Sequence, residues 1–307
     1  MTPLEFILRQ HRAQIKGVIE LRGVRKMRSV YESIRAELES SLASLVRTGR
    51  GETFTAYHSR LVLVQVREAI KQMGGAMVTQ LTSTGSLASQ LGVKHTISAV
   101  KGLEKQFTGH TPVLQLEQAA VTRGVYKSIQ PSLLNRYKKS ERYYGAPVVE
   151  AIKTELAKSI ISGETIDGAV ARVAGTDGIF SAQRWRADRI VRTEMAYSYG
   201  ATQHRAMDEV KKDIPKLQKK LIETFDDRTG EDSKILHGQV RELDEPFVYD
   251  PPPGKKGYPP FQHSPGRPND RSITLAWNPA WTDSSVTREG GTGPGDVRAE
   301  VPKNLVT

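Results

Sequence analysis

The chain has 307 residues, which is enough for two domains with cores of their own. Its 45 Lys and Arg residues against 34 Asp and Glu residues give a formal charge of +11, which predicts a polyanionic partner unless the charge serves solubility alone. Nucleic acid is the commonest such partner, followed by an acidic protein surface or a membrane. The absence of Cys excludes disulfides and thiolate metal sites. Because neither a signal-peptide pattern nor an apolar run of ~18 residues is found, we expect a protein made in a reducing cytoplasm that does not enter a membrane.

The N-terminal sequence predicts a long amphipathic helix. Thr2 can cap it and Pro3 suits its first position. Apolar residues recur at helical spacing for some forty residues, with a weak point near Gly23 and a stop at 48–51. Such a helix would be ~65 Å long at 1.5 Å per residue. A helix of that length cannot bury its apolar face within a small domain, and the mean hydropathy of the chain is low, at −0.46. We therefore expect other subunits to cover the apolar face.

Further helices separated by Gly and Pro are expected up to residue 183. We expect a helix at 53–72 with a break at Gly74-Gly75, and short helices joined by flexible links through 82–110. After a connector at 109–112, two helices are expected within 112–144, with a break at Gln130-Pro131. Two shorter helices complete the region, at 147–161 and within 163–175, with Thr165 or Ser181 as helix caps.

Two basic clusters lie on these helices. The first comprises Arg22, Arg25, Lys26 and Arg28, and the second comprises Arg136, Lys138, Lys139 and Arg142. Each cluster predicts either a phosphate or partner contact or simply a solvated helical face. The second is interleaved with Tyr137, Tyr143 and Tyr144, which could stack on a nucleic-acid strand but more often anchor a helix to its neighbour.

The C-terminal half contains a long helix and then a region rich in turns. The helix is expected from Arg184 to Val210, and a strand is expected at 222–225 after the break at Pro215. Frequent Pro after Gln239 excludes another long helix and leaves short strands at 247–249 and 272–277. Residues 283–307 are Gly- and Ser-rich, so we expect a flexible tail or an arm that orders on a partner.

A set of polar residues follows a recognisable order within this half. An Arg-Thr-Glu triplet on the helix is followed by an aromatic residue, an Asp-Arg-Thr step and an apolar-His-Gly step. The residues concerned are Arg192, Thr193, Glu194, Phe225, Asp227, Arg228, Thr229, Leu236, His237 and Gly238. Over roughly residues 150–280, this pattern resembles the phage head morphogenesis family of Mu F-like and SPP1 gp7-like minor head proteins. The resemblance implies a structural protein at or near the portal of a phage head.

One departure from the family pattern concerns metal binding. Many members carry cysteines where this chain has Gly230 and Ser233, and a second pair where it has Asp270 and Ser272. Four soft ligands are therefore missing together, as expected if a metal site was lost as a unit. We expect no zinc and no other cofactor.

The same polar residues also permit an enzymatic interpretation. Asp227 with His237 could form an acid/base pair or bind a divalent cation, with Arg192 and Glu194 completing the pocket. In the structural interpretation, which we favour, Asp227 and Arg228 close a turn and pair with Arg192 or Glu194. No Walker sequence, HExxH or Gly-x-Ser-x-Gly is present, which argues against a packaging motor and common hydrolases.

Together these patterns predict a mainly α protein with a small α+β C-terminal part. We expect an extended helical region at 1–110, a head-morphogenesis domain at 111–282 and a tail at 283–307. The expected function is that of a non-enzymatic minor head protein in the virion, in several copies at the head interior or portal vertex. Its expected partners are the portal or major capsid protein, with sequence-independent contact to DNA. The alternatives are a nuclease or transferase using Asp227, His237 and Glu194, and a free DNA-binding protein.

Overall fold

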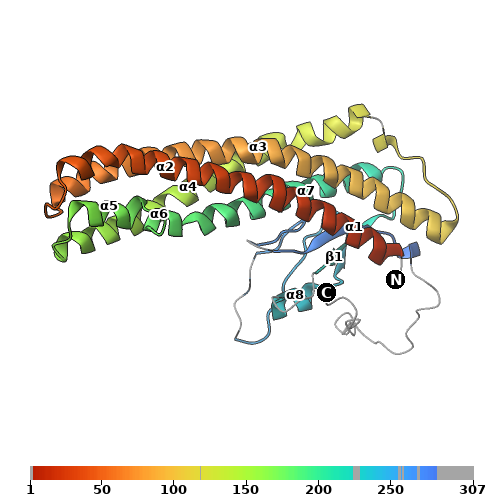
Figure 1. The fold of residues 1–307 in the computed structure, drawn as a ribbon. Coiled ribbons are helices and arrows are strands. Elements are labelled where there is room, and N and C mark those ends of the chain that lie inside the picture. The colour runs from red at the N-terminus through yellow and green to blue at the C-terminus, as the bar shows by residue number, and fades with distance from the viewer. Residues whose placement is uncertain are drawn as a thin grey trace. The chain divides into compact units, whose positions relative to one another are not determined.

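A computed structural model describes residues 3–117, 119–223, 229–254, 257, 259–267 and 270–281 (Figure 1). Helices account for 71% of the structure, and a small antiparallel sheet lies near the C-terminal end of the described chain. The predicted fold class is therefore confirmed. The tail predicted at 283–307 lies outside the described residues.

The N-terminal helical run is confirmed, and its weak point is a stretch of π-helix. Helix α1 (Pro3–Gly17) continues through η1 (Val18–Val24), which is π-helical, into α2 (Arg25–Thr48). A π turn changes the backbone hydrogen-bond pattern, and here the side-chain amide of Gln80 donates to the carbonyl oxygen of Arg22 at 2.6 Å. The helix ends at Gly49, as expected from the Gly-rich stop.

Helix α3 (Ala56–Thr108) is continuous, so the predicted break at Gly74-Gly75 and the predicted short helices at 82–110 are wrong. A buried stripe crosses the first of these regions at helical spacing, and tertiary packing of this kind overrides the low helix propensity of Gly. The stripe comprises Val66, Ile70, Met73, Met77 and Leu81. In the Thr-rich part, hydroxyl groups donate to carbonyls one turn earlier, as Thr84 does to Gln80 at 2.7 Å and Thr96 to Gly92 at 3.0 Å, so these buried side chains are satisfied within the helix.

Helix α4 (Ala119–Ile161) follows the short η2 turn (Gln115–Glu117) and passes through both Pro131 and Pro147. The predicted break at Gln130-Pro131 and the separate helix at 147–161 are therefore wrong. Proline removes one backbone hydrogen bond, but the burial of one helix face compensates for that loss. The buried face comprises Leu133, Tyr137, Ser140, Tyr144, Val148, Ile152 and Leu156. The helix ends before Gly163, which has a positive φ of 65°.

Shorter elements precede the long C-terminal helix. Helix α5 (Ile166–Ala174) is capped by Thr165, whose hydroxyl accepts from the backbone N–H of Gly168, while Ser181 lies inside α6 (Ile179–Ala182) and is not a cap. Helix α7 (Arg184–Val210) has the bounds predicted from the sequence. Helices α5 and α6 lie beside α2 (Figure 1).

The sheet has the strand order β2-β1-β3, with both pairings antiparallel. Strand β1 (Gln218–Ile222) begins four residues before the predicted strand, whose last two positions lie outside the described residues. After β1 come α8 (Glu231–Leu236) and β2 (Val240–Arg241). Strand β3 (Ile273–Trp277) was predicted, and it is followed by η3 (Pro279–Trp281). At the other predicted strand, 247–249, there is a single bridge from Phe247 to Phe261.

The chain divides into two compact units that combine distant segments. We call Lys16–Gly85 with Pro131–Met195 the helical unit, and Met1–Ile15, Ser86–Gln130 and Ala196–Thr307 the sheet unit. The domain boundaries expected at 110 and 282 remain a prediction.

The sheet unit has an apolar core that joins its helical segments to the sheet. Its largest members include Leu103, Met207, Leu217 and Trp281. Near this core α3 and α7 approach so closely that a Cβ atom on Gly92 would lie 2.7 Å from the carbonyl oxygen of Tyr199. Only glycine fits at that point.

Candidate functional site: an ion-pair seam and a buried polar cluster

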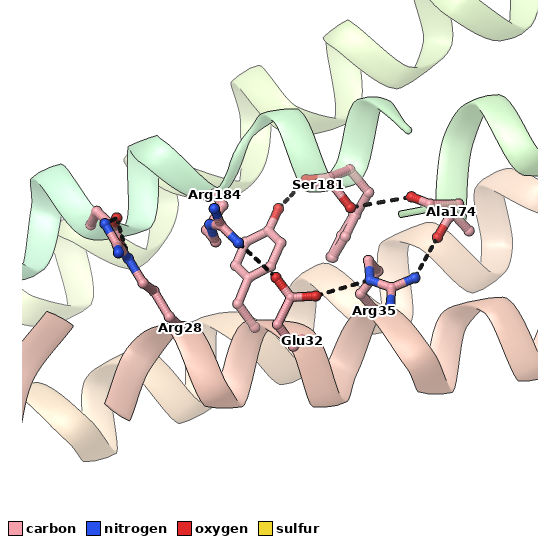
Figure 2. A network of polar contacts seen from close by, with 10 residues as sticks. Arg28, Glu32, Arg35, Ala174, Ser181 and Arg184 are labelled. Carbon is pink, nitrogen blue, oxygen red and sulfur yellow. Dashed lines mark hydrogen bonds and ion pairs between the residues drawn. The ribbon is translucent and has the colours of Figure 1, made fainter. Parts of the chain in front are cut away.

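Charged side chains connect the N-terminal helices to α7 within the helical unit. Glu20 binds Arg192 through two hydrogen bonds of 2.8 and 3.2 Å, and Arg28 binds Asp188 at 2.6 and 2.8 Å. Arg184 binds Glu32 at 2.8 Å, and Arg35 contacts Glu32 and the carbonyl oxygen of Ala174 (Figure 2). We call the three pairs Glu20–Arg192, Arg28–Asp188 and Glu32–Arg184 the seam. Because their positions advance by one or more turns along each helix, the pairs fix how the two helices align.

The seam lies at the edge of the helix contact, and its members differ in exposure. Asp188 is buried, whereas the side chains of Arg28 and Arg184 are 47% and 45% exposed. A hydrogen bond from Arg192 lowers the pKa of Glu20, and the bond to Asp188 raises the pKa of Arg28. The bond to Glu20 in turn raises the pKa of Arg192, so the Glu20–Arg192 pair is charged at neutral pH.

The Arg-Thr-Glu triplet is divided between the surface and the interior. Arg192 points to Glu20, while Thr193 and Glu194 are buried. Arg136 of α4 donates to Glu194 at 2.5 Å, yet burial still raises the pKa of Glu194. The triplet thus ties α7 to both η1 and α4, which is a structural role.

The predicted basic clusters differ in what their members contact. In the first, Arg22, Arg25 and Lys26 are exposed, while Arg28 belongs to the seam. In the second, Lys138 and Lys139 are exposed and Arg136 is paired with Glu194; the side chain of Arg142, like that of Tyr143, lies outside those described. Tyr137 and Tyr144 are fully buried, as expected of residues that anchor a helix. A phosphate or partner contact through either cluster remains a prediction.

The sheet unit holds a second concentration of polar groups, around strand β1. Glu223 is buried, and burial together with Asp270 raises its pKa to about 8. Its backbone N–H donates to Nδ1 of His237 at 3.1 Å, and its carbonyl oxygen accepts from Arg12 at 2.8 Å. Burial lowers the pKa of His237 to about 4, so the ring is neutral at pH 7.

Lys219 lies in the same strand and is fully buried. Its ammonium group donates to the carbonyl oxygens of Leu243 and Gln262, both at 2.9 Å, and to the side chain of Gln262 at 2.8 Å. Burial lowers its pKa to about 8. We call Lys219, Glu223 and their partners the β1 cluster. Lys219 attaches the segment around Gln262 to the sheet.

Ser233 and Asp270, two of the positions where the resemblance led us to expect cysteines, take part in polar contacts. Arg267 donates to the hydroxyl of Ser233 at 2.6 Å and forms an ion pair with Asp232. Asp270 accepts from the backbone N–H groups of Gly266 and Ser272, both at 2.9 Å. Among the described residues, no group of three or more His, Asp or Glu side chains is arranged to hold a metal ion.

The remaining motif residues are only partly covered by the structure. Phe225, Asp227 and Arg228 lie outside the described residues, and the pairing of Asp227 and Arg228 with Arg192 or Glu194 remains a prediction. Thr229 precedes α8 and is half-buried. Gly238 has a φ of 81°, which explains why the apolar-His-Gly step ends in glycine.

Several residues of both regions were missed in the sequence. Glu20 and Arg192 are 172 residues apart, and no local pattern reveals such a pair. Lys219 and Glu223 are four residues apart, and residues an even number apart in a strand lie on the same face. A strand assigned from Gln218 onward would therefore have placed Lys219 and Glu223 on one face.

The comparison with family models gave a match over residues 150–260, to the family described as phage Mu protein F like protein. The resemblance to the phage head morphogenesis family is therefore confirmed for this part of the chain. The comparisons with curated proteins and with solved structures gave no match. No helix among the described residues is both long and apolar enough to cross a membrane.

Proposed function

We propose that this chain is a structural minor head protein of a tailed bacteriophage, which acts in head assembly beside the portal or the inner capsid surface. The match of residues 150–260 to the Mu F-like family carries the proposal. That family points to a phage head morphogenesis protein; the portal or major capsid protein as partner is our extension.

The chemistry of the family region supports a structural role. Within the helical unit Arg192 and Glu194 each bind an oppositely charged side chain, namely Glu20 and Arg136. Side chains fixed in this way hold helices together, and perturbed polar groups alone are weak pointers to catalysis.

An exposed apolar face on α3 supports assembly with neighbouring subunits. Tyr57, Leu61 and Val64 are spaced by four and three residues, so they lie on one face, and they are 65%, 39% and 58% exposed. Isolated exposed apolar residues are common, but three on one face suit a surface that other copies or capsid subunits cover. We infer several copies per particle, in the head interior or at the portal vertex.

The test is cryo-electron microscopy of intact particles in which this chain and its neighbours are identified. We expect density for the helical unit next to the portal or the inner capsid surface. Finding the chain absent from purified heads would overturn the proposal.

The enzymatic alternative is separated from the structural one by substitution. Asp227→Ala and His237→Ala should impair folding or incorporation into heads if these residues are structural. Normal incorporation together with loss of a nuclease or transferase activity would instead favour the enzyme. A free DNA-binding protein would bind DNA as an isolated monomer and would not be found in heads.

A further inference from the structure

The two helix segments that form the seam carry a surplus of positive charge. Residues 18–32 and 184–192 contain eight Lys and Arg residues but only three acidic ones, Glu20, Glu32 and Asp188. All three carboxylates are bound by seam arginines. The exposed cations outside the seam are Arg22, Arg25, Lys26 and Arg189, and no ion pair among the described residues involves them. Two of these four, Arg25 and Arg189, share one spacing relative to the seam.

Helix geometry places these two arginines beside the seam. Arg25 precedes Arg28 by three residues, and Arg189 precedes Arg192 by three, so each lies one turn from a seam arginine on its own helix. Trp185 precedes Arg189 by four residues and is 50% exposed. The guanidinium of Arg186 lies 4.7 Å from the centre of the Trp185 ring and restrains its orientation.

The result is a row of guanidinium groups on two aligned helices with an exposed indole beside it. Guanidinium groups bind phosphates in a bidentate manner, and an exposed aromatic ring stacks on unpaired bases. We infer that this surface, made of Arg25, Arg189 and Trp185 beside the seam, binds the phosphate backbone of nucleic acid. The inference rests on the proposed function only in taking DNA inside the phage head as the natural ligand.

Nucleic acid suits this surface better than an acidic protein does. An acidic protein would also satisfy the arginines, but stacking of an exposed indole on an unpaired base is an interaction that only nucleic acid offers. The arginines face phosphates without a base-reading element, so the binding should be independent of sequence.

The test is fluorescence anisotropy with the full-length protein, using a labelled random-sequence DNA duplex and a labelled single strand over a range of salt concentrations. Arg25→Ala/Arg189→Ala should lower duplex affinity about tenfold or more near physiological salt, and it should reduce the salt slope by about 2. Trp185→Ala should lower affinity for the single strand about fivefold or more, with a smaller effect on the duplex.

A matched control removes the same charge elsewhere in the helical unit. Arg60 and Arg67 of α3 are exposed and form no ion pair among the described residues. Arg60→Ala/Arg67→Ala should change duplex affinity less than about threefold if binding is local. Equal losses in both double variants would overturn the inference, as would a wild-type protein that does not bind DNA at low salt.

Competition and incorporation separate the remaining outcomes. Polyglutamate that displaces the duplex as effectively as unlabelled DNA of equal charge would overturn a nucleic-acid surface in favour of an acidic protein partner. Variants that lose DNA binding yet enter heads normally would support both proposals. A chain that binds DNA through Arg25 and Arg189 but is absent from heads would overturn only the proposed function.

Discussion

The seam of the helical unit and the β1 cluster of the sheet unit use similar residue types in opposite ways. The seam joins long side chains near the surface, so each arginine keeps contact with water. In the β1 cluster Lys219 is fully buried and bound to backbone carbonyls, and Glu223 is held with its pKa raised to about 8. The comparison shows that the burial of a charged side chain, more than its charge, decides how much stability is lost when the side chain is replaced.

The largest expected effect comes from a backbone contact in the sheet unit. Gly200 of α7 packs against the carbonyl of Ser264, and an added Cβ would clash with that oxygen. Gly200→Ala should therefore lower the free energy of unfolding by about 4 kcal/mol, above the usual cost of overpacking because a backbone carbonyl cannot move aside. Urea denaturation followed by circular dichroism measures this loss.

The matched substitution in the helical unit is Gly23→Ala. There the added Cβ would meet the side chain of Met195, which can move, so the expected loss is about 1 kcal/mol. Equal losses at Gly200 and Gly23 would contradict the distinction between a clash with fixed backbone and a clash with a movable side chain.

The next effect tests the buried lysine. Lys219→Ala should cost about 3 kcal/mol, because it leaves the carbonyl groups of Leu243 and Gln262 without a donor. Lys220, the adjacent residue of β1, lies 4.2 Å from the ring centre of Trp277, and Lys220→Ala should cost about 1 kcal/mol. Thermal and urea denaturation of both variants checks the difference. A smaller loss of stability for Lys219→Ala than for Lys220→Ala would contradict the role given to the buried ammonium group.

The third prediction concerns pH. Burial raises the pKa of folded Glu223 to about 8 from the usual 4.5, so the folded protein keeps a proton that the unfolded chain releases. Its stabilising contribution is complete below pH 4.5 and is lost as pH rises to about 8. Glu223→Gln, which cannot ionise, should therefore be more stable than wild type by about 2 kcal/mol at pH 9 and comparable to it near pH 4.5. A constant difference across this range would show that Glu223 is not protonated in the folded protein.

The smallest effects are expected in the seam. Arg28→Ala leaves the buried carboxylate of Asp188 without its cation and should cost about 1 kcal/mol. Arg184→Ala breaks a pair with two exposed partners and should cost less than about 0.5 kcal/mol. Urea denaturation at low and high salt distinguishes them, since added salt screens the exposed pair more strongly. A greater loss in Arg184→Ala than in Arg28→Ala would contradict the argument that the pair with the buried carboxylate contributes more.

The sequence predicted elements that are set by local patterns. The bounds of α7, the weak point at Gly23 and the strand at 273–277 follow from apolar periodicity and helix breakers. It failed where packing outweighs propensity, because Gly74-Gly75 and Pro131 lie inside α3 and α4.

The candidate site was predictable only in part. The Arg-Thr-Glu triplet and the first basic cluster were identified from the sequence, but Glu20 and Asp188, the carboxylates that bind Arg192 and Arg28, were not. Glu20 and Arg192 meet through tertiary packing across 172 residues. Lys219 escaped notice because lysine is almost never fully buried without partners, and these partners are backbone groups that a sequence does not show.

The contact between Gly92 and the backbone of Tyr199 restricts how this protein can vary. Where two main chains touch, no larger residue can be accommodated, and sliding either helix by a turn would place a side chain where Gly92 now meets the backbone of Tyr199. Mutational tolerance along α3 should therefore be lowest at Gly92 and should recover within a turn on either side. Substitutions in the surrounding sequence therefore have to be compatible with this close contact between the two helices.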